Sequence, residues 1–212
     1  MQPKAPIDFL IVQLDKAFQD TIITDSGLTL FKGKSDTPEW DVTILGTVVS
    51  TPNRLSSKQE LKGIEVEVVP GDKVLFSYLV VFDLDFKDRD NPVHHNLFYF
   101  EGQWYWKVDY QHVYGYIRNE KLHAVQDYVI CEPVEEVTEK VGLIWMPEMS
   151  KKKKPEGKGK VVAIGKARKG EPELSINEGD VVRFPQKFAC KYEIEGKQYL
   201  VLTQGKILAT EI

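Results

Sequence analysis

The feature that most constrains this chain is an internal repeat, since a sequence that carries one pattern twice must fold so that both copies are satisfied. Residues 8–12 read Asp-Phe-Leu-Ile-Val, and residues 127–131 read Asp-Tyr-Val-Ile-Cys. In each place a polar stretch containing acidic residues follows, and then a glycine with three largely apolar residues, at 27–30 and at 142–145. Further matched segments follow in the same order: 46–49 with 159–162, 70–76 with 178–184, and 116–125 with 202–210.

Shared β-strand composition does not explain landmarks that keep their order along the chain, so we interpret the repeat as a tandem duplication. The sequence then divides near Gln126 into a first domain, 1–126, and a second domain, 127–212. A chain of 212 residues has room for two domains of this size. The first copy is longer because an aspartate-rich insert lies near 78–96.

The spacing of apolar residues predicts an all-β fold in both copies. Short apolar runs and alternations are separated by glycine, proline and polar residues, as is typical of short strands. Glu101-Gly102 and Glu195-Gly196 lie between such runs and predict two hairpin turns. Helix is predicted over 14–19 and 57–61, both too short to organise a fold. The predicted strands are 9–14, 42–50, 64–69, 73–81, 97–100, 103–108, 113–117, 128–133, 161–164, 181–184, 189–194 and 197–203.

Each copy carries a Gly-Asp pair just before a strand, at 71–72 and at 179–180. Glycine accepts a positive φ, and aspartate can accept hydrogen bonds from freed backbone N–H groups, so we expect a tight corner in both copies. Alternation along the strands that follow then points four apolar side chains into a core: Val74, Phe76, Val182 and Phe184.

Composition excludes several classes of function. The chain has 28 basic and 32 acidic residues and a formal net charge of −4, so it offers no basic field for general nucleic-acid binding. No window approaches the roughly 18 apolar residues that cross a bilayer, and the first residues lack the apolar core of a signal peptide. Cys131 and Cys190 lack the spacing of a zinc site. We expect a cytoplasmic protein with neither a nucleic-acid nor a membrane partner.

No constellation of residues predicts catalysis. We recognise neither a Gly-x-Ser-x-Gly signature nor a Ser-His-Asp or Cys-His set. His94 and His95 are adjacent, and this spacing does not present two imidazoles to one metal. The lysines at 151–154 are expected to be solvated, and the aromatic residues at 98–106 to pack rather than bind a ligand. The sequence therefore predicts no enzyme, no metal and no cofactor.

The apolar triplets stand beside segments that cannot pack a core. Residues 32–39 and 147–159 are dominated by charged residues, proline and glycine, a composition that predicts mobile loops. One interpretation makes each triplet an ordinary core strand next to an ordinary loop. Because the repeat keeps triplet and loop together, we favour the alternative in which the triplet anchors a partner.

The order of these landmarks resembles the co-chaperonins of the GroES family. In the second copy the resemblance covers nearly all of the domain, through residues 127–130, 142–145, 159–165, 177–184 and 206–209. The first copy is similar in outline and diverges across the insert; its matching segments are 27–30, 46–49, 70–76 and 121–124.

The resemblance implies two tandem, partly open GroES-like β-barrels, each with a mobile loop, and no enzymatic activity. It implies self-association into a ring that caps an ATP-driven, GroEL-like chaperonin and assists protein folding, with ATP bound by that partner. In the family an apolar tripeptide at the head of the mobile loop docks on the chaperonin. The matching positions here are Leu28, Thr29, Leu30, Leu143, Ile144 and Trp145.

Two alternatives accompany this hypothesis. The first is a stand-alone GroES-like barrel, a binding or structural module without chaperonin activity. The second is the related barrel of zinc alcohol dehydrogenases, which is disfavoured because no dinucleotide fingerprint or cysteine-rich zinc segment accompanies it. Ordering of the loops on a chaperonin partner would distinguish the co-chaperonin from the stand-alone module.

Overall fold

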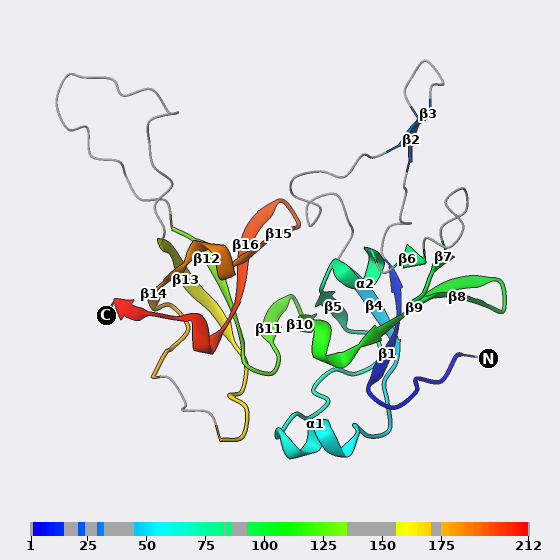
Figure 1. Ribbon diagram of the computed structural model, residues 1–212, viewed down its shortest axis with the longest axis horizontal. Coiled ribbons are helices and arrows are strands. Elements are labelled where there is room, and N and C mark those ends of the chain that lie inside the picture. Colours follow the sequence, from blue (N-terminus) through cyan, green and yellow to red (C-terminus); the bar gives the residue numbers. More distant parts are fainter. Residues whose placement is uncertain are drawn as a thin grey trace.

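A computed structural model describes the chain at residues 2–14, 21–23, 29–31, 45–82, 84–85, 93–134, 156–170 and 175–211. Two antiparallel sheets form two adjacent lobes, one from each half of the sequence (Figure 1). The helices in these ranges are short, so the predicted all-β fold class is confirmed. None of the described helices is long and apolar enough to cross a membrane.

The first sheet contains seven strands. They are β1 (Phe9–Leu14), β4 (Leu45–Ser50), β5 (Lys73–Phe76), β8 (Leu97–Phe100), β9 (Gln103–Asp109), β10 (Val113–Arg118) and β11 (Lys121–Ala124). Their order across the sheet is β11-β10-β5-β4-β1-β9-β8.

The second sheet contains six strands. They are β12 (Tyr128–Pro133), β13 (Glu156–Ile164), β14 (Val181–Pro185), β15 (Cys190–Ile194), β16 (Lys197–Thr203) and β17 (Ala209–Glu211). Their order is β15-β16-β12-β13-β14-β17.

Smaller elements connect these strands. Two short ladders pair β2 (Thr21–Ile23) with β3 (Thr29–Phe31), and β6 (Leu84–Asp85) with β7 (Val93–His94). The helical elements are α1 (Ser57–Leu61), α2 (Leu79–Phe82) and the 3-10 turns η2 (Tyr110–His112), η4 (Gln186–Phe188) and η5 (Gln204–Lys206). The helix predicted over 57–61 is thus confirmed, whereas the one over 14–19 lies almost wholly outside the described residues.

The two sheets share one strand order. Read from one edge, β8-β9-β1-β4-β5-β10 corresponds to β15-β16-β12-β13-β14-β17. A β-bulge interrupts the β1–β4 ladder between Ile11 and Val12, and the β12–β13 ladder has the same irregularity between Ile130 and Cys131. A bulge is a local backbone feature that strand composition does not dictate. The repeat in the sequence is therefore also a repeat of backbone geometry.

The Gly-Asp corners form as predicted. Their two glycines have φ values of 96° and 99°, in the left-handed region that favours glycine. In the first corner the N–H of Val69 donates to Oδ2 of Asp72, and in the second the N–H of Asn177 donates to Oδ2 of Asp180, both at 2.8 Å. Each aspartate thus holds its own corner closed.

Both predicted hairpin turns are confirmed. Glu101 and Gly102 join β8 to β9 with φ values of 45° and 86°, and Glu195 and Gly196 join β15 to β16 with values of 51° and 80°. Positive φ at both central residues is the geometry of a type I′ turn, whose twist matches that of the flanking strands.

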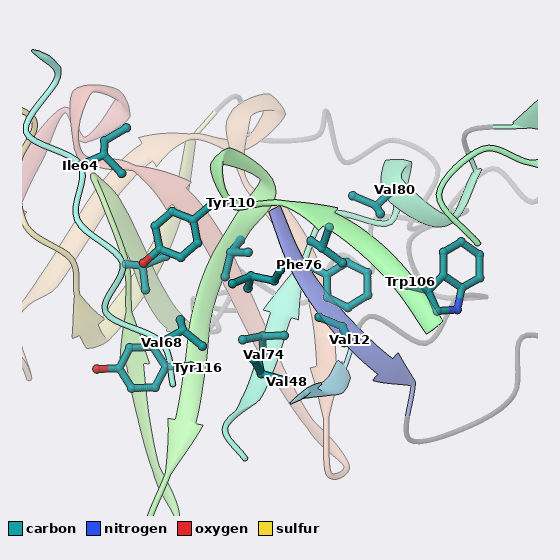
Figure 2. Close-up of a cluster of buried hydrophobic side chains, with 14 of the residues drawn as sticks. Val12, Val48, Ile64, Val68, Val74, Phe76, Val80, Trp106, Tyr110 and Tyr116 are labelled. Carbon is teal, nitrogen blue, oxygen red and sulfur yellow. The ribbon is translucent and has the colours of Figure 1, made fainter. Parts of the chain in front are cut away.

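Each sheet covers its own hydrophobic core. The four side chains predicted to point inward are 1% exposed or less: Val74, Phe76, Val182 and Phe184. The core of the first sheet, seen in Figure 2, includes Val12, Val48, Val74, Phe76, Trp106 and Tyr110. The core of the second includes Val129, Cys131, Val161, Val182, Phe184 and Leu202. Each half therefore has an apolar core of its own. Burying one large apolar side chain in such a core contributes about 1.5–3 kcal/mol to stability.

One predicted strand is wrong and another is too long. Residues 64–69 form no strand, because the backbone of Glu67 bonds to side chains: its N–H donates to the Tyr110 hydroxyl and its carbonyl accepts from Arg118. The strand predicted over 73–81 ends at residue 76, where the hydroxyl of Ser77 accepts a hydrogen bond from the first turn of α2. Apolar runs alone did not reveal these side-chain partners.

The last matched pair of segments is also corrected. β10 places Tyr116 opposite Val74 of β5, and β17 places Thr210 opposite Val182 of β14. Tyr116 therefore corresponds to Thr210, and the segment that the sequence matched to 206–209 is instead β11. This strand covers the outer edge of β10 and has no counterpart in the second half as described.

The strand pairings leave both sheets open. β8 and β11 end the first sheet, and β15 and β17 end the second. Neither sheet closes on itself through strand pairing within the described ranges.

Candidate interaction surfaces

The apolar tripeptides predicted to contact a chaperonin fall mostly outside the described residues, which exclude Leu28, Leu143, Ile144 and Trp145. Thr29 and Leu30 begin β3 and pair with Ile23 and Ile22 of β2. Figure 1 shows this short hairpin standing away from both sheets. The structure therefore places the backbone of Thr29 and Leu30 alone among the six.

The segments that carry the tripeptides join corresponding strands. Residues 15–44 connect β1 to β4, and residues 134–155 connect β12 to β13. At the root of the first connection Leu14 pairs with Gly46, and at the root of the second Pro133 pairs with Gly159. Both connections thus leave their sheets at equivalent places.

A glycine occupies the root of each connection for a steric reason. A Cβ atom added to Gly46 would overlap Cγ1 of Val12, and one added to Gly159 would lie 2.7 Å from Cβ of Cys131. The paired strands approach too closely for any side chain at these two positions. This explains why the matched segments 46–49 and 159–162 both begin with glycine.

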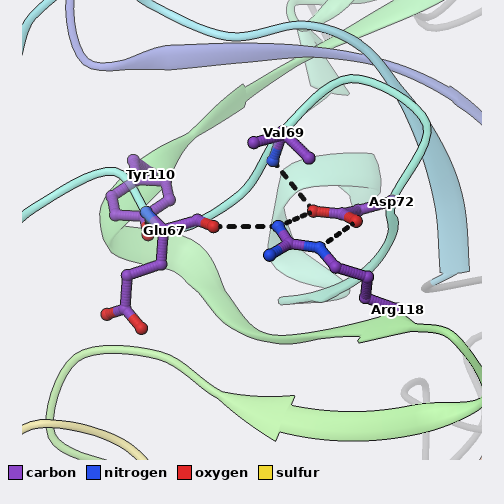
Figure 3. A network of polar contacts seen from close by, with 5 residues as sticks. All are labelled: Glu67, Val69, Asp72, Tyr110 and Arg118. Carbon is purple, nitrogen blue, oxygen red and sulfur yellow. Dashed lines mark hydrogen bonds and ion pairs between the residues drawn. The ribbon is translucent and has the colours of Figure 1, made fainter.

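An ion pair ties the corner of the first half to β10 (Figure 3). Arg118 donates through Nε to Oδ1 of Asp72 at 2.9 Å and through Nη2 to Oδ2 at 2.7 Å. The same Nη2 donates to the carbonyl of Glu67 at 3.1 Å, and the guanidinium stacks on the ring of Tyr116. Since both oxygens of the 4%-exposed carboxylate are engaged, the pair acts as a structural tie.

Electrostatics follow from this geometry. Burial raises the pKa of Asp72, but the hydrogen bonds from Arg118 and from the backbone of Val69 outweigh it, so the net pKa lies below the usual 3.8. Burial raises the pKa of Glu67 above its usual 4.5 and that of Tyr110 well above its usual 10.0. Tyr110 therefore remains a neutral phenol that accepts the Glu67 N–H.

In the second half, charged side chains of β13, β14 and β17 form an ion-pair cluster. Glu211 on β17 accepts from Nε of Arg183 at 2.6 Å, and Nζ of Lys158 lies 2.9 Å from the same carboxylate. Hydrogen bonds from Lys158 and Arg183 hold the pKa of Glu211 below its usual 4.5. This cluster is solvent-accessible, with Arg183 40% and Glu211 41% exposed.

A third apolar cluster joins the two halves. It unites Leu75 and Ala124 of the first sheet with Ile130, Ala163, Tyr192 and Val201 of the second. At its border the ring of Tyr114 lies 4.9 Å from that of Tyr128 and 5.5 Å from that of Tyr192. Sequence reasoning missed this interface because it assigned Tyr114 to one domain and Tyr128 and Tyr192 to the other. The signal for it in the sequence was a tyrosine at each of the positions 114, 128 and 192.

Polar bonds reinforce the same boundary. Gln126, where the sequence divides, has a positive φ of 54° and is 4% exposed. Its side-chain amide donates to the carbonyl of Tyr110 at 2.7 Å, and the N–H of Lys169 donates to the carbonyl of Lys62 at 3.0 Å. The boundary is therefore a packed junction.

The side chains that could bind a metal ion lie apart in the described residues. Within those ranges no group of three or more His, Cys, Asp or Glu side chains is placed to hold a metal ion. Burial raises the pKa of the Cys131 thiol to about 12, so this thiol stays protonated at neutral pH.

Comparison with known proteins places the second half in a family. The family described as Chaperonin 10 Kd subunit matches residues 121–211. The co-chaperonin GroES of Geotalea daltonii is 36% identical over 92 residues, which are 42% of this chain and 94% of that protein. The GroES of Aquifex aeolicus is 42% identical over 95 residues (42% of this chain, 75% of that protein), and that of Thermus thermophilus is 36% identical over 92 residues (42% and 89%).

Residues 121–211 thus form a Chaperonin 10 domain. The chain belongs to the GroES co-chaperonin family. The matched region begins at β11, the strand that pairs with β10 of the first half.

Proposed function

We propose that this protein is a co-chaperonin that caps an ATP-driven, GroEL-like chaperonin ring and assists protein folding. The observation that carries the proposal is the family match over residues 121–211, with relatives named as co-chaperonins. In this proposal the chaperonin binds ATP, and the present chain acts in the cytoplasm without catalysis or a cofactor of its own.

We also propose that the chain holds two GroES-like barrels, 1–126 and 127–212. The shared strand order, the recurring bulge and the two Gly-Asp corners support this. The insert near 78–96 then lies between β5 and β8, where the second half has the short turn η4.

The proposed chaperonin contacts are the tripeptides at 28–30 and 143–145, through Leu28, Thr29, Leu30, Leu143, Ile144 and Trp145. Support comes from the roots of the two connections, which leave the sheets at equivalent places. Burying one apolar side chain contributes about 1.5–3 kcal/mol, and ordering a loop offsets part of this. Many such contacts around one ring add through avidity, so that a weak single contact stays reversible.

Self-association into a ring is the remaining part of the proposal. β11 covers the outer edge of β10, and the second sheet has no such strand over β17 in the described residues. An uncovered edge strand can pair with a strand from another chain. The segment of a second copy that corresponds to β11 is 2–5, just before its β1.

Light scattering coupled to size exclusion tests the proposal, with the protein alone and mixed with chaperonin and nucleotide. We expect nucleotide-dependent co-elution that Leu143→Ser or Leu28→Ser weakens. Val134→Ser is the matched control, because Val134 is an exposed aliphatic residue just after β12 and outside the tripeptides. A chain that ignores the chaperonin under every nucleotide would leave the stand-alone barrel module as the working hypothesis.

A further inference from the structure

One side of the junction between the two halves is polar, in contrast to the apolar cluster that joins them elsewhere. Here the turn that follows α1 meets the segment that follows β13. The N–H of Lys169 donates to the carbonyl of Lys62 at 3.0 Å, and Nζ of Lys166 lies 3.7 Å from a carboxylate oxygen of Glu65. The halves therefore also meet through hydrogen bonds and charges.

Gln126 lies at the centre of this polar side, and its side chain is held in one orientation. The residue is 4% exposed, and its Nε2 donates to the carbonyl of Tyr110 at 2.7 Å. Because a carbonyl oxygen only accepts hydrogen bonds, the amide nitrogen must point at Tyr110 and the amide oxygen away from it. That oxygen, Oε1, is buried and has no hydrogen-bond partner among the described residues.

The guanidinium of Arg168 presents the complementary group. Its Nη2 lies 2.8 Å from Oδ1 of Asp127, whose side chain is buried, and this ion pair holds the guanidinium in place. The Nε–H of Arg168 is also buried and has no hydrogen-bond partner in the described part of the chain. Buried polar groups in folded proteins are nearly always hydrogen-bonded, either to protein or to ordered water. The junction thus holds one fixed acceptor and one fixed donor that protein atoms do not satisfy.

Gln126 and Arg168 line the same cavity. Its volume is about 10 Å³, and its other lining residues are Gly63, Ile64, Glu65, Glu67 and Lys166. One water molecule needs a cavity of about 10–15 Å³ with at least two polar partners. The cavity therefore has room for a single small molecule next to both unpaired atoms.

The two unpaired atoms decide which small molecule fits. Oε1 of Gln126 needs a hydrogen-bond donor, and Nε of Arg168 needs an acceptor. A metal or ammonium cation cannot accept the Nε–H bond and would face the positive guanidinium. A halide ion accepts that bond but cannot donate to Oε1. Water donates and accepts and carries no charge, so it satisfies both atoms.

We propose that the junction binds one water molecule, which accepts a hydrogen bond from Nε of Arg168 and donates one to Oε1 of Gln126. The water links the halves, because Gln126 is anchored on Tyr110 of the first half and Arg168 belongs to the second. A bridging water is nearly as favourable in enthalpy as a direct hydrogen bond. The junction therefore combines apolar packing on one side with a water-mediated contact on the other.

Magnetic relaxation dispersion of water ¹⁷O tests the proposal in solution, because it counts the water molecules that a protein holds for longer than its own tumbling time. We expect Gln126→Met to hold one such water fewer than the wild type, since methionine has a similar length and no strong acceptor. An unchanged count overturns the proposal.

Gln204→Met is the matched control. Gln204 is also buried, at 6% exposed, and its Nε2 donates to the carbonyl of Gly165 at 2.7 Å, but it does not line this cavity. We expect its replacement to leave the count of long-lived waters unchanged. An equal loss in both variants would mean that the count follows the removal of any buried glutamine, and would overturn the assignment to this cavity.

A crystal structure of the unaltered full chain keeps the test independent of how the variants fold. At a resolution that shows ordered waters, we expect one water oxygen within about 3.2 Å of both Nε of Arg168 and Oε1 of Gln126. A wild-type structure in which these two atoms bond to each other, or in which no water lies between them, overturns the proposal.

Discussion

The two halves share the same residues where the backbone geometry requires glycine, and their residues differ where the side chains face outward. The shared positions are Gly46 with Gly159, which sit where strands nearly touch, and the two Gly-Asp corners with their positive φ. The outer faces differ: one carries Leu45, Leu75 and Ile117, and the other carries Lys158, Arg183 and Glu211 in the same register. A repeated fold can therefore keep its framework while one copy of a surface becomes an interior and the other stays in water.

The largest effect should come from giving the first face the chemistry of the second. Leu75→Arg places a charge where the native side chain is 0% exposed, and no partner carboxylate lies in that apolar cluster. Such a change is expected to lower the free energy of unfolding by about 4 kcal/mol or more. Urea unfolding followed by tryptophan fluorescence measures it.

The matched control is Arg183→Leu at the corresponding position. It removes an exposed ion pair with Glu211 and should change the free energy of unfolding by no more than about 1 kcal/mol. Equal effects of the two substitutions would mean that the junction between the halves is not the apolar interior described.

The tyrosine at the junction gives the next largest effect. Tyr114→Ala deletes a ring that packs between Tyr128 and Tyr192, and large-to-small changes of this kind cost about 3 kcal/mol. Leu208 stands just before Ala209 of β17 as Tyr114 stands just before Gly115 of β10, and it is 59% exposed. Leu208→Ala should therefore cost no more than about 0.5 kcal/mol, because surface substitutions have small effects. Calorimetry at low protein concentration would record a large fall in Tm for the first variant alone. Similar falls for both would mean that Leu208 is packed within the chain as Tyr114 is.

How much of this could be predicted from the sequence depends on whether the deciding interaction was local. Corners, hairpin turns and most strands depend on residues close together in the chain, so Gly71, Gly102 and the alternation of Val74 with Phe76 were sufficient. The absence of a strand at 64–69 depends on Tyr110 and Arg118, which lie far along the sequence.

The surfaces were harder to predict for the same reason. The packing of Tyr114 on Tyr128 joins segments that the sequence assigned to separate domains. The pairing of β11 with β10 was missed because the sequence matched 121–124 to 206–209. The tripeptides at 28–30 and 143–145 stay a prediction. Their repetition is visible in the sequence, while any partner would be another molecule.

The corner aspartates offer a finer comparison. Asp72→Asn keeps an oxygen for the Val69 N–H but removes the ion pair with Arg118, and should cost about 1–2 kcal/mol. Asp180→Asn keeps the corresponding bond from Asn177 and should stay within about 0.5 kcal/mol. Chemical unfolding at neutral pH compares the two, and a larger loss at Asp180 would contradict the structural tie.

The pH dependence of stability tests the same ion pair, because the direction of the change can be predicted. The pKa of Asp72 lies below its usual 3.8 in the folded chain, so the ionised carboxylate favours folding. That contribution is complete above the unfolded-state pKa and is lost as pH falls through the folded pKa. The stability difference between wild type and Asp72→Asn should therefore shrink below about pH 4. A difference that stays constant down to pH 2 would assign the effect to packing instead.

The smallest effect is expected at the hairpin tips, where one half has an aromatic cross-strand pair and the other a polar pair. Tyr99 pairs across the first hairpin with Trp104, while Glu193 pairs with Gln198 at the same place in the second. Tyr99 and Trp104 are 60% and 58% exposed, and their ring centroids lie 5.1 Å apart.

A cross-strand pair of this kind contributes about 0.2–1 kcal/mol. The double variant Tyr99→Glu/Trp104→Gln, which copies the second tip onto the first, should therefore lower the free energy of unfolding by less than about 1 kcal/mol, as measured by urea unfolding. The single variants serve as controls for the pair interaction, since the sum of their effects should exceed the effect of the double by the energy of the pair, about 0.2–1 kcal/mol. A loss of several kcal/mol would mean that this tip supports the first core, whereas the predicted small loss shows that the type I′ turn and the inner residues hold both hairpins alike.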